Sequence, residues 1–199
     1  MKPFSEACDQ NKDPILGVLR EELADAHSVL EIGSGTGQHA VYFARQLTHL
    51  TWYATDLPEH HAGMRLWFEE ANITSIRGPL DLDVRQAQWP VAGVGAVFSA
   101  NTAHIMDWQG VASMFAGVGR VLLPAGVFCL YGPFNYGGCY TSDSNANFDR
   151  WLKNRDPRSG IRDFEALDEL ASAAGMLLQR DYEMPVNNRT LVWRKRSSA

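Results

Sequence analysis

The clearest ligand-binding pattern in the chain is V-L-E-I-G-S-G-T-G, at residues 29–37. Apolar residues of strand character lead into three closely spaced glycines, and a helical pattern follows. Glycines in such a turn let the backbone approach a ligand where a Cβ atom would collide. The turn residues that we expect to bind a cofactor are Gly33, Ser34, Gly35 and Gly37.

The spacing and charge of this turn disfavour a dinucleotide. The dinucleotide fingerprint G-x-G-x-x-G requires its third glycine at position 38, where this chain has Gln38. Glu31 lies two residues before Gly33 and would repel a pyrophosphate. S-adenosylmethionine (SAM) has no phosphate and carries an ammonium and a sulfonium group, so it suits a neighbouring carboxylate better. Alternatively, Glu31 is only a polar residue at the end of a strand.

A second acidic residue lies at the spacing expected for a ribose ligand. Asp56 follows Gly33 by 23 residues, at the predicted end of the second strand, and ribose-binding acids follow the loop by ~20 residues. A carboxylate there accepts hydrogen bonds from ribose hydroxyls, and Leu57 is expected to pack on adenine. Asp56 also suits the N-cap of the next helix, and the two roles are compatible.

The elements that must position these residues alternate between strands and helices, which predicts a mainly parallel sheet. The first helix is expected to start at Asp13-Pro14, an N-cap residue followed by proline in the first turn. A helical apolar face follows near residues 164–174. The other expected helices are residues 38–47, 58–71 and 107–122, and the expected strands are residues 28–32, 50–55, 75–84, 95–100, 126–131, 177–183 and 190–195.

The last two strands, joined by a short turn at Asn187-Asn188, are expected to form an antiparallel hairpin. With this ending the chain resembles the class I SAM-dependent methyltransferases over nearly its whole length. More narrowly, it is similar to a methyltransferase-like family of unknown function. The stretches that carry the narrower resemblance are N-K-D-P-I-L, E-I-G-S-G-T-G-Q-H, S-A-N-T-A-H-I, Y-G-P-F and G-I-R-D.

The resemblance implies a Rossmann-like α/β fold with a seven-stranded sheet and SAM as cofactor. It further implies that the end of the third strand meets adenine, through Leu82, Val84 and an acid. We favour Asp83 for that acid, with Asp81 as the alternative. The segment before the first strand often folds over the cofactor in this class, which brings Asn11 toward the methionine end. The alternative is a frayed terminus followed by a helix.

Acceptor chemistry is expected at the carboxyl ends of the fourth and fifth strands, where open α/β sheets bind ligands. Asn101 is a candidate cofactor contact. His104 is the candidate general base, because the unperturbed pKa of histidine is near ~6.5; alternatively it caps the next helix or packs against Trp108. A base is needed only if the acceptor must lose a proton. Candidate acceptor-binding residues, which alternatively serve the core or structure, are Phe134, Asn135, Tyr136, Tyr140 and Arg162.

We expect a single domain over residues 1–199, with a cap segment and helix at residues 1–27 and a lid-like insertion at residues 132–163. A formal net charge of -5 disfavours duplex nucleic acid as the main partner. The three cysteines show no C-x-x-C spacing and the histidines are scattered, so no metal site is expected. No signal peptide or membrane-spanning run is evident, which favours a cytoplasmic location. The sequence does not indicate an oligomeric state.

These features predict methyl transfer from SAM to a small molecule by in-line displacement. The chain is near the minimal size for the fold and no added target-recognition domain is evident; protein and RNA acceptors remain open. One alternative is a SAM-binding regulatory module without catalysis. The other is an NAD(P)-dependent oxidoreductase, which Gln38, Glu31 and the terminal hairpin disfavour.

Overall fold

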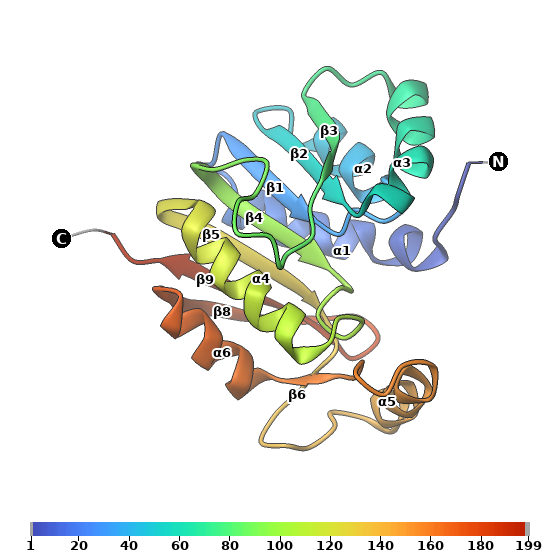
Figure 1. Ribbon diagram of the computed structural model, residues 1–199, viewed down its shortest axis with the longest axis vertical. Coiled ribbons are helices and arrows are strands. Elements are labelled where there is room, and N and C mark those ends of the chain that lie inside the picture. Colours follow the sequence, from blue (N-terminus) through green and yellow to red (C-terminus); the bar gives the residue numbers. More distant parts are fainter. Residues whose placement is uncertain (1, 198–199) are drawn as a thin grey trace.

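The computed structural model describes residues 2–197, which form seven strands of one sheet flanked by helices (Figure 1). The strand order is β3-β2-β1-β4-β5-β9-β8. The seven strands are β1 (Ser28–Ile32), β2 (Thr51–Asp56), β3 (Ile76–Asp81), β4 (Val94–Ala100), β5 (Leu122–Gly132), β8 (Met176–Met184) and β9 (Asn188–Lys195). The helices are α1 (Glu6–Glu22), α2 (Gln38–Gln46), α3 (Pro58–Ala71), α4 (Trp108–Val121), α5 (Asp143–Arg155) and α6 (Phe164–Ala173).

The sheet is parallel from β3 to β5 and antiparallel at β9 and β8. Long right-handed crossovers through helices are the usual connection between parallel strands, whereas β8 and β9 need only the short turn before Asn188. The predicted α/β fold with a terminal antiparallel hairpin is therefore confirmed. Strand β3 ends at Asp81, three residues before the predicted end, and β5 begins at Leu122 instead of Gly126.

Each face of the sheet has its own aromatic core. On one face, covered by α1, α2 and α3, Phe43 and Phe98 pack around Trp52. On the other face, α4 and α6 cover Phe128 and Trp193, whose rings stack 5.6 Å apart. Figure 1 shows α4 and α6 in front of the sheet. Burial of these large side chains fixes the strands rigidly, so the loops at their carboxyl ends are held in place.

The prediction for the first helix was wrong at its start. Helix α1 begins at Glu6, and Ser5 is its N-cap, with Oγ accepting a hydrogen bond from the Cys8 amide. The Asp13 carboxylate instead accepts a hydrogen bond from the Tyr42 hydroxyl. Pro14 therefore lies inside the helix, where it removes the bond that a residue at this position would donate to the Gln10 carbonyl.

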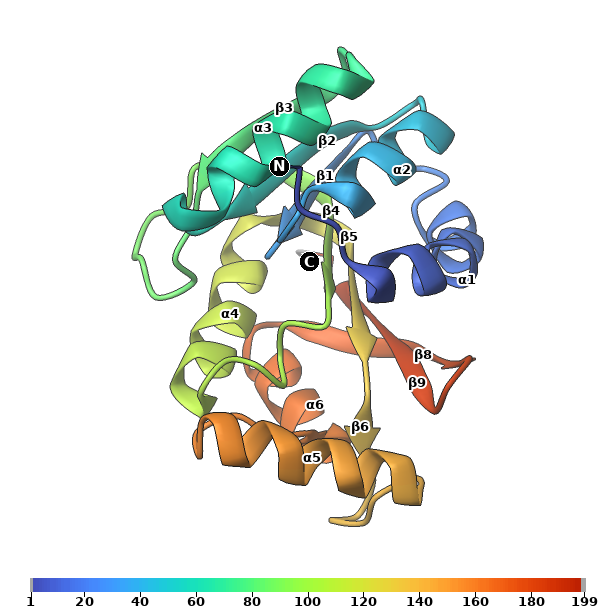
Figure 2. The same cartoon turned by 90° about the vertical axis from the view of Figure 1, so that its right-hand side faces the viewer.

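The segment after β5 contains a helix, α5, that the sequence patterns did not predict. A two-residue strand pair, β6 (Phe134–Asn135) and β7 (Arg162–Asp163), closes the segment at its base. Inside it, the buried Asp149 carboxylate accepts hydrogen bonds from the Tyr140 hydroxyl and the Ile161 amide and pairs with Lys153. Figure 2 shows α5 at the lower end of the molecule and α1 higher, on the right of the view. Asp149 thus ties the two ends of the segment to α5.

None of the helices within residues 2–197 has the length and apolar character needed to cross a bilayer.

Candidate functional site

The glycine turn lies at the carboxyl edge of the sheet, between β1 and α2. Gly33, Gly35 and Gly37 have φ values of 72°, 56° and 88°, which are left-handed conformations that favour glycine. A Cβ atom on Gly33 would lie 2.6 Å from the Thr102 side chain. The turn is anchored to the next strand, because the amides of Gly33 and Ser34 both donate to the Thr55 carbonyl, at 3.1 and 3.0 Å. The backbone is therefore fixed before any ligand binds.

Asp56 ends β2 and binds the same turn from the other side. Its Oδ2 accepts the Gly35 amide at 2.6 Å, and its Oδ1 accepts the Leu57 amide at 2.7 Å. His60 Nε2 lies 3.9 Å from Oδ1. The side chain is nearly buried yet borders a cavity, so its remaining lone pairs face the space where a ligand would lie.

A cavity of about 440 Å³, here called the glycine-loop cavity, opens beside these residues. Its size falls within the range of small-molecule and cofactor sites. It brings together most of the residues predicted to bind the cofactor: Gly33, Ser34, Gly35, Asp56, Leu57, Leu82, Asp83, Val84 and Asn101. Gly37 is the N-cap of α2 and lies outside the lining.

Glu31 is also absent from the lining, because its side chain is used inside the protein. Its Oε2 accepts hydrogen bonds from Trp52 Nε1 at 2.9 Å and Ser34 Oγ at 2.8 Å, and the residue is 2% exposed. Burial raises the pKa of Glu31 to about 7, and the two hydrogen bonds oppose the rise only in part. The structure thus gives Glu31 a role in holding the glycine turn to the core, through Ser34, and not direct contact with a ligand.

We expect Glu31→Gln to stabilise the cofactor-free protein at pH 8. Since the folded protein holds the proton more tightly than the unfolded chain, Glu31 lowers the free energy of unfolding progressively as pH rises from 4.5 through 7. A shift of this size corresponds to about 3 kcal/mol, or roughly 5–10 °C in Tm. Glutamine keeps an oxygen acceptor without the charge. Thermal unfolding at pH 8 and pH 5 measures the effect.

The advantage of Glu31→Gln should shrink toward zero at pH 5, where the wild-type carboxyl is protonated. Glu69→Gln is the matched control, because Glu69 is exposed on α3 and should give no pH-dependent difference. Other titrating groups are common to both proteins and cancel. A lower Tm for Glu31→Gln at pH 8 would show that the ionised carboxylate stabilises the turn.

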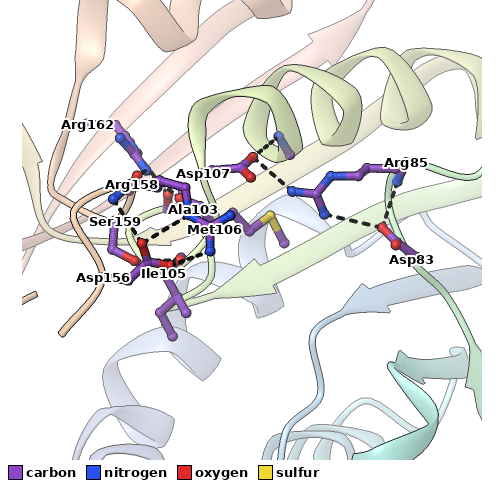
Figure 3. A network of polar contacts seen from close by, with 11 residues as sticks. Asp83, Arg85, Ala103, Ile105, Met106, Asp107, Asp156, Arg158, Ser159 and Arg162 are labelled. Carbon is purple, nitrogen blue, oxygen red and sulfur yellow. Dashed lines mark hydrogen bonds and ion pairs between the residues drawn. The ribbon is translucent and has the colours of Figure 1, made fainter. Parts of the chain in front are cut away.

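Asp83, rather than Asp81, borders the glycine-loop cavity. Figure 3 shows Asp83 joined to α4 through Arg85. The Arg85 guanidinium lies 3.5 Å from Asp83 Oδ1 and 2.8 Å from Asp107 Oδ1. Asp107 is the N-cap of α4 and accepts the Gly110 amide at 2.7 Å. The ion pairs of Arg85 with Asp83 and Asp107 therefore connect the loop after β3 to the start of α4, beside the cavity.

The N-terminal segment covers the other side of this cavity. Ser5 and Cys8 are part of its lining. Ser5 is fixed by Gln38, whose Oε1 accepts the Ser5 amide at 2.5 Å, while Trp67 Nε1 donates to the Pro3 carbonyl at 2.7 Å. Gln38, which stands where the dinucleotide fingerprint requires its third glycine, thus anchors the N-terminal segment that covers the cavity.

A second cavity of about 700 Å³, here called the α5 cavity, lies between α1 and α5. Asn11 lines this cavity and not the first one, and its Oδ1 lies 2.7 Å from His39 Nε2. The two cavities adjoin, because both linings contain Ser5, Ala7, Asn101 and Ile105. Asn101 lies at this junction in a left-handed conformation, with φ of 57°, which asparagine tolerates better than most residues.

His104 lines the α5 cavity and is 6% exposed. Its ring meets the Phe148 ring edge to face, with centroids 5.3 Å apart. Burial, and to a lesser degree the positive charge of Arg162, lowers the pKa of His104 to about 4. The imidazole is therefore neutral at physiological pH and has a nitrogen lone pair available to accept a proton.

The predicted acceptor-binding residues do not line the α5 cavity. Phe134 is buried in the core and Asn135 is buried in β6, where its Oδ1 finds no hydrogen-bond partner within residues 2–197. Tyr136 donates to Asp181, and Tyr140 donates to Asp149. Their polar groups are thus paired within the protein or removed from the cavity.

Arg162 also serves the protein framework. Its guanidinium donates to the carbonyls of Ala103, Met106 and Arg158, as Figure 3 shows. Ser159 adds a bond from Oγ to the Ile105 carbonyl at 2.7 Å. The segment 159–162 therefore holds the loop that carries His104, and the Arg162 guanidinium is occupied by backbone carbonyls in this structure.

Helix α5 contributes six residues to the lining of the α5 cavity: Ser144, Asn145, Phe148, Trp151, Leu152 and Arg155. A sequence signal for this helix exists. Ser142 is an N-cap residue, with Oγ accepting the Asn145 amide, and residues 148, 151, 152 and 155 follow at helical spacing. Gly137 and Gly138, just before this helix, favour a loop, which is why no helix was predicted here.

The glycine-loop cavity fits SAM on the chemistry of its walls. Asp56 offers carboxylate lone pairs for ribose hydroxyls, and Leu57, Leu82 and Val84 offer apolar contact for a base. The first turn of α2 contains no acid, so its N-terminus can accept a carboxylate. Within residues 2–197, no group of three or more histidine, cysteine or acidic side chains is arranged to hold a metal ion.

Solved structures share this fold at low sequence identity. An O-methyltransferase family protein from Burkholderia thailandensis superposes with a TM-score of 0.83 at 14% identity, covering 94% of this chain and 57% of its own. Human N-acetylserotonin methyltransferase in complex with SAM gives 0.79 at 16%, covering 96% and 53%. The chain thus spans little more than half the length of these proteins. YcgJ from Bacillus subtilis gives 0.74 at 15%, covering 94% of this chain and 100% of its own.

A family described as "Protein of unknown function (DUF938)" matches residues 2–195. The sheet order, the terminal hairpin and the structural similarities agree with the resemblance seen in the sequence. The protein therefore belongs to the DUF938 family and has the fold of the class I SAM-dependent methyltransferases.

Proposed function

We propose that this protein transfers a methyl group from SAM to a small-molecule acceptor. The observation that carries the proposal is the pair of adjoining cavities, which have Ser5, Ala7, Asn101 and Ile105 in common. One cavity has the lining expected for a nucleoside, and the other has an aromatic lining with a neutral histidine. Two ligands held in neighbouring cavities can react with little further loss of entropy.

In the glycine-loop cavity, Asp56 holds the ribose hydroxyls, and Leu57, Leu82 and Val84 contact adenine beside Asp83. The glycine turn and Asn101 bind the methionine end. When bound, SAM supplies an electrophilic methyl group on its sulfonium. The protein's task is then to hold an acceptor lone pair in line with that group and to exclude water.

In the α5 cavity, His104 takes the proton from the acceptor hydroxyl. Burial lowers its pKa to about 4, so the ring is neutral at physiological pH. A base this weak accepts the proton as the acceptor oxygen bonds to the methyl carbon, because bond formation makes the hydroxyl strongly acidic. The ring contacts Phe148, and Arg162 fixes the surrounding loop through three carbonyls. A small acceptor fits the volume of the cavity.

We further propose that residues 1–199 act as a single domain, in which the N-terminal segment caps the cofactor and residues 132–163 form a lid over the acceptor. Ser5 and Ala7 belong to both linings, and α5 supplies one wall of the acceptor cavity. The human relative solved with SAM supports the choice of cofactor. The second, aromatic cavity beside the first supports a reaction between two ligands over the binding of one.

The test is parallel thermal unfolding with S-adenosylhomocysteine (SAH), SAM, NAD and NADP, followed by a methyl-transfer assay with hydroxylated small molecules. We expect a Tm increase with SAH and SAM but not with NAD or NADP, and methyl transfer to at least one acceptor. Cofactor stabilisation without transfer to any acceptor class would favour the regulatory module. A Tm increase with NAD alone would overturn the proposal.

A further inference from the structure

The wall of the α5 cavity has three features that together define a ligand class: stacked aromatic rings, a single cation and a neutral base. Phe148 and Trp151 stack with centroids 5.8 Å apart and an interplanar angle of 16°. The His104 and Phe148 rings pack edge to face, with an interplanar angle of 75°. Trp151 is half exposed, so aromatic surface is available to a ligand. Such rings favour planar aromatic ligands, which stack at low entropic cost.

The lining of the α5 cavity carries a positive charge, although the protein as a whole has a formal net charge of -5. Among the described residues that line it, Arg155 alone carries a fixed charge, and the lining contains no carboxylate. The glycine-loop cavity, by contrast, contains Asp56 and Asp83. The α5 cavity is therefore complementary to a ligand with one negative charge.

Arg155 is also free to bind that charge. Its guanidinium lies 4.7 Å from the centroid of the Trp151 ring, and within residues 2–197 no carboxylate lies within 4.0 Å of it. The nearest acids along the chain have other partners. Asp149 pairs with Lys153 at 2.6 Å, and Asp156 pairs with Arg158 at 2.9 Å. A guanidinium has the planar donor geometry that matches a carboxylate.

The order of the side chains along this wall defines the order of the groups on the ligand. His104 contacts α5 at Phe148, and Arg155 lies two turns further along the helix. The guanidinium lies back against Trp151, so the wall runs from His104 to Phe148 (5.3 Å), from Phe148 to Trp151 (5.8 Å) and from Trp151 to Arg155 (4.7 Å). That order suits an aromatic ring with a hydroxyl at one end, toward His104, and a carboxylate on a short side chain at the other, toward Arg155.

We propose that the acceptor is a hydroxylated aromatic acid, whose ring stacks on Phe148 and Trp151, whose carboxylate pairs with Arg155 and whose hydroxyl faces His104. This inference rests on the proposed function for the transfer itself. In that transfer the hydroxyl proton passes to His104, the oxygen forms a bond to the methyl carbon, and the sulfonium leaves as a neutral thioether.

The test measures binding first, so that it does not depend on turnover. The probes are 3-(4-hydroxyphenyl)propanoate, 4-hydroxyphenylacetate and the methyl ester of each, in which the carboxylate is replaced by a neutral group that is larger by one methyl. Quenching of tryptophan fluorescence and titration calorimetry, with SAH present and absent, give the Kd values. We expect the wild-type protein to bind at least one acid roughly tenfold more tightly than its ester.

Arg155→Gln should abolish that preference and leave the Kd of the ester nearly unchanged. Arg150→Gln is the matched control, since Arg150 is exposed on the same helix and is absent from the cavity lining. It should retain the tenfold preference. Arg155 is itself exposed, and an unchanged Tm verifies that the variant folds.

Equal binding of acid and ester, a preference that survives in Arg155→Gln, or no measurable binding of either acid would overturn the inference. Arg155-dependent binding without methyl transfer would support the aromatic-acid site and count against the proposed transferase function. Failure of SAH to raise Tm would count against the cofactor assignment alone. The two proposals thus fail by different readouts.

Discussion

Asp56→Ala is expected to abolish the stabilisation of the protein by SAH. Asp56 supplies the lone pairs proposed to bind the ribose, and it also accepts the amides of Gly35 and Leu57, which shape the cavity. A ligand at 100 times its Kd adds ~2.7 kcal/mol to the free energy of unfolding. At roughly 2–4 °C per kcal/mol for a chain of this size, the wild-type Tm should rise by about 5–10 °C, and the variant Tm by less than about 1 °C.

Two companion variants separate ligand binding from shape. Asp56→Asn keeps one of the two oxygens that accept the Gly35 and Leu57 amides and loses the charge. We expect it to have a lower Tm than the wild type without ligand, a smaller loss than in Asp56→Ala, and to bind SAH much more weakly. Asp81→Ala is the matched control, because Asp81 pairs with Asp56 in the sheet register yet does not line the cavity. An SAH-dependent Tm increase that persists in both Asp56 variants would exclude Asp56 as the ribose ligand.

His104→Ala is expected to lower kcat about 10²–10⁴-fold for a hydroxyl acceptor, the range typical of a lost general base. His104 does not line the glycine-loop cavity, where SAH is proposed to bind, so the Kd for SAH should stay within about twofold. His27→Ala provides the control, because His27 lies at the opposite end of β1 from the glycine turn and should leave kcat unchanged. Steady-state kinetics with the best acceptor from the assay measure the effect.

The pH profile of the wild type gives a second readout for His104. A histidine must be neutral to act as a base, so activity is lost as pH falls through its pKa. Because that pKa is lowered to about 4, kcat/KM should hold nearly constant from pH 7.5 to 5.5. With the unperturbed pKa of ~6.5, it would fall roughly tenfold over the same range. An acid limb near pH 6.5, or full activity in His104→Ala, would remove His104 from the proposed chemistry.

Local patterns were sufficient to predict the parts of the site that are made by short stretches of chain. The glycine turn requires left-handed backbone at three positions, and only glycine provides it readily, so the turn is visible in the sequence. Asp56 ends a buried strand beside that turn. The terminal hairpin follows from two strand patterns separated by a turn that is too short for a crossover.

The remaining features depend on contacts between distant residues. Helix α1 begins before the predicted cap because Ser5 caps it and Gln38, 33 residues later, fixes Ser5 in place. The aromatic and charged residues near 134–162 have chemical types suited to an acceptor site. Their partners, such as Asp181 for Tyr136 and three backbone carbonyls for Arg162, are set only by the tertiary fold.

The two cavities are lined largely by different segments of the chain, which has a consequence for how the protein can evolve. Asp56, the glycine turn and the loop after β3 form the first cavity, whereas α5 forms the outer wall of the second. Asp149 secures α5 within its own segment, through Tyr140, Lys153 and Ile161. On the proposed function, replacement of residues on the inner face of α5 is therefore expected to change which acceptor is bound without altering the cofactor contacts. The same division would allow acceptor preference to diversify among members of the family without loss of the proposed SAM site.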